Sequence, residues 1–182
     1  LRQRDATGQG CHLDIAMVDA TFTFAWHALA ETFASGTVPG AGQGDLAGGL
    51  PRYRLYPAKD GAIVACAALE NHFWQRFASV IGLDRSLIDD RRDPAATMAA
   101  VARIIATRSA AEWAPVFAQA DCCVTIMRSL EEALSDPHFI ARGLFAHRVR
   151  GAQGATLPAL PVPIDPQFRD APGSEKPSPP PR

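Results

Sequence analysis

The sequence predicts an α/β fold, and a hairpin signal and two helical patterns carry that prediction. A short aromatic segment, 52–56, and an apolar, β-rich segment, 62–68, flank the turn signal Lys59-Asp60-Gly61, which is typical of a β-hairpin. Apolar side chains then recur at helical spacing over 70–81, and again after Asp93-Pro94. Of the 182 residues, 47% are hydrophobic and 20% are charged, so the chain can build a core.

Composition excludes two classes of partner. The net charge is −1, and lysine and arginine are dispersed along the chain, so neither nucleic acid nor an anionic membrane surface is an expected partner. No apolar stretch approaches the roughly 20 residues that span a bilayer. Residues 1–5 are polar with no apolar segment behind them, which argues against a signal peptide. We expect a soluble cytoplasmic protein. Its first residue is Leu1 and not Met, which fits a chain cut from a longer one.

The first 50 residues give three expectations. Residues 12–17 favour a short strand, and the Ala-rich apolar run 18–33 favours a buried helix. Residues 35–50 contain six glycines and a proline, so no regular element is expected there. That segment is either a flexible linker or a binding loop shaped by its backbone, because glycine lets a ligand approach the chain closely.

Helix boundaries are marked by capping residues in the middle of the chain. The helix over 70–81 ends at Gly82, and Asp93 with Pro94 begins the next one as N-cap and first residue. Ser109 and Glu112 form a capping box that opens a third helix. A strand over 123–127 and a short helix from Ser129 follow.

Order is expected to fade after Val149. The segment 157–166 is apolar but interrupted by proline and fits an extended arm. Residues 171–182 contain five prolines and are expected to be disordered.

The four cysteines show no metal-ligand spacing. Cys122 and Cys123 are adjacent, and there is neither a CxxC pair nor a Cys/His cluster. We expect these two, together with the other two cysteines, Cys11 and Cys66, to be reduced thiols in the core.

Four groups of residues, in this order, carry a resemblance to one family. They are Thr7-Gly8-Gln9-Gly10 with Asp14 and Asp19-Ala20; Tyr53 to Tyr56 with Asp60-Gly61 and Ala68-Leu69-Glu70-Asn71-His72-Phe73-Trp74; Thr107 to Trp113 with Asp121 to Val124; and Asp136-Pro137-His138 with Arg142-Gly143 and Phe145. In this order they resemble the family III CoA-transferases, which include formyl-CoA and carnitine CoA-transferases. The α-methylacyl-CoA racemases share that fold, and the segment 68–74 is more similar to the racemase branch.

This resemblance implies the C-terminal part of the family III CoA-transferase fold. It assigns 1–34 to a strand and helix of the large Rossmann-like domain and 51–150 to the small α/β domain. Between them, 35–50 is a Gly-rich linker or loop; 151–170 is an extended arm returning to the large domain, and 171–182 is the disordered tail. In the family, two full-length chains interlock into a homodimer.

The same resemblance implies the chemistry. The transferases use an aspartate that becomes acylated, and the racemases use an Asp and a His that exchange the proton next to the thioester. Both lie upstream of the segment that begins at Thr7, and only six residues precede it here. We therefore expect a fragment of an acyl-CoA-processing enzyme, inactive alone, with a CoA thioester and a carboxylic acid as substrates and no tightly bound cofactor. The alternative is a non-catalytic binding or assembly module that pairs with a separate N-terminal half.

Five residues are candidates for the site. In the racemase branch the glutamate at the position of Glu70 supports the catalytic His; otherwise Glu70 only adds an anion to the first turn of its helix. Gly48 and Gly49 belong either to a loop that closes over the thioester or to a plain linker. Tyr53 and Tyr56 either contact the acyl group or fill the core.

Overall fold

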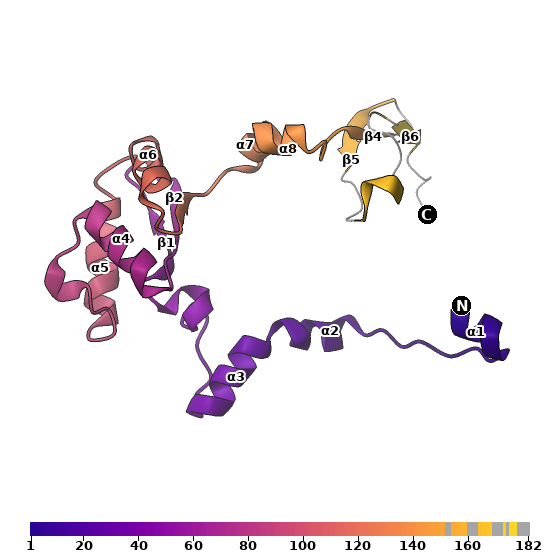
Figure 1. The fold of residues 1–182 in the computed structure, drawn as a ribbon, viewed down its shortest axis with the longest axis horizontal. Coiled ribbons are helices and arrows are strands. Elements are labelled where there is room, and N and C mark those ends of the chain that lie inside the picture. Colours follow the sequence, from indigo (N-terminus) through magenta and orange to yellow (C-terminus); the bar gives the residue numbers. More distant parts are fainter. Residues whose placement is uncertain (152–153, 160–163, 169–172, 174, 178–182) are drawn as a thin grey trace. The chain divides into compact units, whose positions relative to one another are not determined.

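The computed structural model describes residues 1–151, 154–159, 164–168, 173 and 175–177. They fall into two compact units, Leu1–Ile126 and Met127–Arg182, which are described separately below (Figure 1). The domain boundaries expected from the sequence stay predictions.

An antiparallel sheet of three strands forms the centre of the first unit. The predicted hairpin is confirmed: β1 (Tyr53–Pro57) pairs with β2 (Ile63–Ala67), and β2 pairs with β3 (Val124–Ile126). The turn of the hairpin closes as predicted, because the Gly61 amide donates to the Ala58 carbonyl over 3.0 Å.

Helices α4 (Asn71–Ile81), α5 (Pro94–Ile105) and α6 (Ala110–Ala120) pack with this sheet (Figure 1). Successive side chains of a strand point to opposite faces, and Tyr56, Val64 and Cys66 point toward the helices. Aromatic rings fill the space between the helices: the Trp113 and Phe117 rings stack with centroids 5.2 Å apart. Each large side chain buried here contributes about 1.5–3 kcal/mol. This core is therefore the main source of stability in the first unit.

The predicted helix signals are confirmed. The Asp93 carboxylate accepts from the Ala96 amide, and Pro94 is the first residue of α5. Both hydrogen bonds of the capping box between Ser109 and Glu112 are present at the start of α6. Helix α4 ends at Gly82, as expected.

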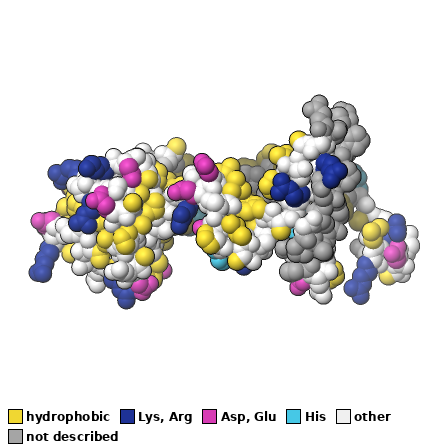
Figure 2. Space-filling view, turned by 90° about the horizontal axis from the view of Figure 1, so that it is seen from above, with side chains coloured by type: hydrophobic (Ala, Val, Ile, Leu, Met, Phe, Trp, Pro, Cys, Tyr) yellow, Lys and Arg dark blue, Asp and Glu magenta, His cyan; other side chains and the backbone are white. Residues whose placement is uncertain are grey.

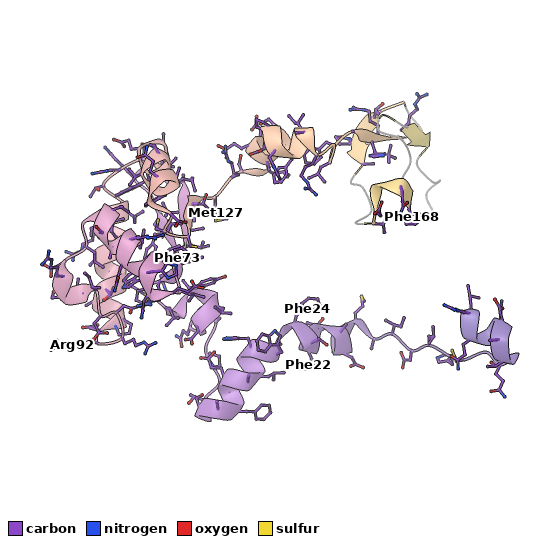
Figure 3. All side chains as sticks on the ribbon, in the orientation of Figure 1. Phe22, Phe24, Phe73, Arg92, Met127 and Phe168 are labelled. Carbon is purple, nitrogen blue, oxygen red and sulfur yellow. The ribbon has the colours of Figure 1, made fainter. Side chains whose placement is uncertain are left out.

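Two expectations for the N-terminal region are wrong. Residues 11–16 form no strand, because none of the described strands pairs with them. In place of the single buried helix expected over 18–33, the chain forms two exposed helices, α2 (Met17–Phe24) and α3 (Trp26–Ser35). A short helix, α1 (Arg2–Thr7), precedes them. Phe22 is 61% exposed and Phe24 87% exposed, and both project from α2 in Figure 3. Their apolar pattern was predicted to face a core, but no described element covers it.

The second unit begins with two short helices, α7 (Leu130–Leu134) and α8 (Pro137–Ala141). A small sheet follows in the order β5-β4-β6, formed by β4 (His147–Arg150), β5 (Thr156–Ala159) and β6 (Glu175–Pro177).

Order thus continues past Val149, where it was expected to fade. The expected arm over 157–166 begins inside β5, but its residues 160–163 lie outside the described residues. The expected disordered tail also lies mostly outside them, although Glu175–Pro177 form β6. Among the residues that the structure describes, no helix is long and apolar enough to cross a membrane.

Candidate functional site

A pocket of about 350 Å³ lies where the Gly-rich loop meets the hairpin. It is lined by Leu46, Ala47 and Gly48 from the loop, by Tyr53, Arg54 and Leu55 from β1, and by Ala65, Cys66 and Ala67 from β2. Most of these residues are apolar, and Arg54 is the charged residue among them.

Strand register explains why there is space for a pocket. Tyr53 lies opposite Ala67, and Leu55 lies opposite Ala65, so a large side chain faces a small one in both pairs. All four point to the face of the sheet opposite Tyr56, which is the face that the helices cover. Leu55 is accordingly 56% exposed. The sheet therefore presents a shallow apolar surface next to the loop.

The loop has a defined backbone over η1 (Asp45–Gly49). The amides of Ala47 and Gly49 both donate to the Gly44 carbonyl, over 2.9 and 3.0 Å. A Cβ at Gly49 would lie 2.1 Å from the Gln43 carbonyl oxygen, so no larger residue fits this turn. Gly48 has a φ of +98°, a conformation that glycine adopts without strain. Residues 44–49 therefore have a defined turn, while the choice between a linker and a binding loop for 35–50 stays a prediction.

Arg54 connects this loop to the rest of the first unit. Its Nη1 donates to the Gly48 carbonyl and lies 3.3 Å from the Sδ atom of Met98 on α5. No feature of the sequence predicts this contact, because an exposed arginine on a strand is ordinary. The bond ties Gly48 of the loop to Arg54 of β1.

Glu70 is placed apart from that pocket, as the N-cap residue of α4. Its side chain is exposed, makes no capping hydrogen bond, and has no hydrogen bond or ion pair to any described residue. Because the Glu70 carboxylate makes no hydrogen bond to the helix, it can accept hydrogen bonds from a group outside the described residues.

Arg52 holds the residues on both sides of Glu70. Its Nη1 donates to the Leu69 carbonyl over 3.0 Å and to Asn71 Oδ1 over 2.9 Å. Its Nε and Nη2 donate to the two carboxylate oxygens of Asp90, over 2.8 and 2.5 Å. The ion pair between Arg52 and Asp90 was not predicted from the sequence, since the two residues are 38 positions apart.

The structure brings together only some of the predicted site residues. Gly48 and Tyr53 line one pocket, while Gly49 forms the turn behind it. Tyr56 is 1% exposed, its hydroxyl donates to the Pro51 carbonyl over 2.7 Å, and burial raises its pKa above the usual value for tyrosine. Tyr56 thus serves the core of the sheet.

The cysteines correct one expectation. All four are free, as expected, but only Cys66 and Cys122 are buried, whereas Cys11 and Cys123 are exposed. Cys123 has a left-handed backbone, with a φ of 53°, and Cys11 precedes α2, where no described element packs over the chain. Burial raises the pKa of the Cys66 thiol to about 12. Among the residues with described positions, no group of three or more His, Cys, Asp or Glu side chains could hold a metal ion.

Sequence comparison identifies the family. The sequence model of CoA-transferase family III matches residues 1–182. The chain is 30% identical to α-methylacyl-CoA racemase of Mus musculus, over 80% of this chain and 39% of that protein. It is 29% identical to acetyl-CoA:oxalate CoA-transferase of Acetobacter aceti, over 97% of this chain and 46% of that protein. The chain therefore spans less than half the length of these relatives.

Solved structures support the same fold. A crystal structure of a point mutant of Rv3272 from Mycobacterium tuberculosis superposes with a TM-score of 0.65 at 16% identity, covering 97% of this chain and 46% of that one. Another crystal structure of Rv3272 gives a TM-score of 0.61 at 17% identity, covering 90% and 44%. At this identity the likeness concerns the fold alone, and it confirms the predicted α/β class. Because the family match extends over its whole length, the chain belongs to CoA-transferase family III.

Proposed function

We propose that this chain is part of an acyl-CoA-processing enzyme, which either transfers CoA between carboxylic acids or epimerises a 2-methylacyl-CoA. The observation that carries this proposal is the family match over residues 1–182. Two kinds of relative, a racemase and a CoA-transferase, are both named for acyl-CoA substrates. Both reactions act on a thioester, so both need a site that holds the acyl group and keeps water away from it.

The pocket beside the Gly-rich loop is our candidate for contact with the acyl group. Tyr53 and the small side chains of Ala65 and Ala67 offer an apolar surface, and Gly48 lies at its edge. A backbone without side chains lets a thioester approach closely. The bond from Arg54 to the Gly48 carbonyl would keep the loop in place while the acyl group is bound.

Glu70 is our candidate for a supporting carboxylate. A carboxylate that accepts a hydrogen bond from an imidazole fixes the tautomer of the ring and raises its basicity. The side chain of Glu70 is exposed and makes no hydrogen bond to the helix. Both of its oxygens can therefore accept a hydrogen bond from a group outside the described residues. Its competing role, as an anion at the start of α4, would contribute only about 0.3–1 kcal/mol to stability.

We further propose that these 182 residues do not turn over an acyl-CoA by themselves, since they span less than half the length of the relatives. The substrates would be a CoA thioester and a carboxylic acid, with no tightly bound cofactor. The interlocked homodimer of the full-length protein and its cytoplasmic location stay predictions.

An assembly module is the second candidate, and the exposed apolar side chains favour it. Phe22, Trp26 and Phe33 of α2 and α3 are more than half exposed. Figure 2 shows hydrophobic side chains, in yellow, on the surface of the protein. Such a surface fits a chain that pairs with a separately encoded N-terminal half.

One experiment separates these readings. The polypeptide encoded by the complete open reading frame and the 182-residue chain are each assayed for CoA transfer to a carboxylic acid and for exchange of the α-proton of 2-methylacyl-CoA in deuterated water. We expect activity only in the longer protein, and the active assay identifies the branch. Turnover by the short chain would contradict its proposed incompleteness. A longer protein inactive in both assays would contradict the acyl-CoA function, and a reading frame no longer than this chain would favour the assembly module.

A further inference from the structure

We propose that Arg52 and Asp90 are positioning residues for Glu70, which set the residue at which α4 begins and thereby the direction of the Glu70 carboxylate. This inference rests on the supporting role proposed for Glu70. It concerns two residues that do not line the acyl pocket.

The first observation is the pattern of hydrogen bonds. A single guanidinium nitrogen of Arg52, Nη1, bonds to Leu69 on one side of Glu70 and to Asn71 on the other, over 3.0 and 2.9 Å. Both neighbours of the N-cap residue are therefore held by the same planar group. The remaining donors, Nε and Nη2, bind Asp90, so the guanidinium cannot rotate without breaking several bonds.

The second observation is the burial of this pair. The side chains of Arg52 and Asp90 are only 12% and 4% exposed. The guanidinium lies 5.3 Å from the Trp74 ring centroid, and the Trp74 indole donates to the Ile88 carbonyl over 2.7 Å, close to Asp90 in the chain. Removing two charges from water costs about as much as their attraction returns, so a buried ion pair is a weak source of net stability. What it supplies here is a fixed geometry.

The third observation concerns the start of the helix. Asparagine is among the preferred N-cap residues, because its side-chain oxygen accepts from amides of the first turn. Asn71 follows Glu70 directly and would compete with it for the N-cap position. Arg52 occupies the Asn71 oxygen, so α4 begins at Asn71 with Glu70 as its N-cap. Without Arg52, Asn71 is free to cap the helix one residue later, and the backbone that directs Glu70 would change.

Activity of the complete protein tests this through a double-mutant cycle. Arg52→Lys and Asp90→Asn keep the approximate size of each side chain but remove the fork of donors or the charge. We expect each to lower kcat by about 10- to 100-fold, as for a small misplacement of a reacting group. The KM for the acyl-CoA should stay within about twofold, because the acyl pocket lies on other residues. In an enzyme that already carries Glu70→Gln, Arg52→Lys should cause little further loss.

A matched control is on the same helix. Arg76 of α4 pairs with Asp121, and both side chains are exposed. Arg76→Lys should therefore leave kcat unchanged. If Arg52→Lys has no effect on kcat, or lowers it equally with and without Glu70→Gln, the positioning role is overturned. If Glu70→Gln itself leaves kcat unchanged, or the wild type is inactive, the proposed function fails instead.

A second measurement does not depend on activity. In the 182-residue chain, the backbone 13Cα chemical shifts of Glu70, Asn71 and Ser79 report where α4 begins. Glu70 already has an extended backbone as the N-cap residue, so the expected change is at Asn71. Arg52→Lys should shift the signal of Asn71 toward non-helical values while leaving Ser79 in the same helix unchanged. Arg76→Lys should leave the chemical shifts of both Asn71 and Ser79 unchanged. An unchanged shift at Asn71 in Arg52→Lys would overturn the inference, whatever the enzyme assays give.

Discussion

The carboxylate of Asp60 accepts a hydrogen bond from the backbone amide of Ala110, over 3.0 Å, although the two residues are 50 positions apart. Its other oxygen accepts from the Ala62 amide in the same turn, over 3.3 Å. Beside it, the Lys59 amide donates to the Arg108 carbonyl over 2.9 Å. The hairpin turn is thus joined to the first turn of α6, which is more than the turn chemistry that the sequence assigned to Asp60.

Replacing Asp60 tests how much this junction contributes. Asp60→Ala removes both acceptors and leaves the Ala110 amide without its partner, so we expect the free energy of unfolding to fall by about 1–2 kcal/mol. Urea unfolding followed by tryptophan fluorescence measures this. Asp60→Asn retains one acceptor and should lose less. Equal midpoints for the wild type and Asp60→Ala would show that the bond to Ala110 contributes nothing.

Local signals explain why the middle of the chain was predictable. The turn at Gly61, the caps at Asp93 and Ser109, and the stop at Gly82 each act within a few residues, so their meaning is visible in the sequence. The aromatic segment and the apolar, β-rich segment on the two sides of that turn likewise placed the hairpin correctly.

The N-terminal region could not be predicted in the same way. Its apolar pattern was correctly recognised as helical, but burial depends on what covers a helix, and no described element covers α2 or α3. The interruption at Ala25 carries no glycine or proline signal.

The candidate site was also only partly visible. Gly48 and Tyr53 share a pocket as a loop-and-strand site would require. The contacts that hold the site, from Arg54 to Gly48 and from Arg52 to Asp90, involve arginines that have no distinguishing neighbours in the sequence. Such pairs are set by the fold and appear only once the strands and helices are placed.

Gly49 offers a sharp test of the loop beside the pocket. A Cβ there would lie 2.1 Å from the Gln43 carbonyl oxygen, which belongs to the backbone and cannot move aside cheaply. We expect Gly49→Ala to destabilise the first unit by about 1–3 kcal/mol, the range for an overpacked site. Gly10→Ala is the matched control, since nothing lies within 4 Å of the added carbon. A Gly49→Ala variant as stable as Gly10→Ala would mean that the loop rearranges freely.

The four thiols should differ in reactivity. The attacking species in thiol modification is the thiolate, and burial raises the pKa of Cys66 to about 12 and that of Cys122 above its usual value. In the folded chain at mildly alkaline pH, a disulfide reagent such as dithiobis(nitrobenzoate) should therefore titrate Cys11 and Cys123 rapidly. Cys66 and Cys122 should react only after unfolding in urea. Mass spectrometry of the labelled peptides identifies the sites, and uniform labelling of all four would contradict the burial described here.

The capping box of α6 predicts a specific dependence of stability on pH. The amide of Ser109 and its hydroxyl donate to the Glu112 carboxylate over 2.8 and 2.7 Å, and these bonds hold the pKa of Glu112 below its ordinary 4.5. A carboxyl group whose pKa is lower in the folded state binds its proton more readily when unfolded. Its contribution to stability is therefore complete above pH 4.5, the ordinary value, and is lost as the pH falls through the lower pKa of the folded state.

Comparing the wild type with Glu112→Gln isolates this contribution. The difference between their free energies of unfolding should be constant near neutral pH and should shrink steadily below pH 4.5. Ser109→Ala removes the donor hydroxyl and should weaken the pH dependence of that difference. Urea titrations followed by circular dichroism at a series of acidic pH values measure it. Because Ser129 and Glu132 form an equivalent box in the second unit, Glu132→Gln serves as the comparison, and it should leave the unfolding of the first unit unchanged. A difference that grows toward acidic pH would reverse the sign expected from these bonds.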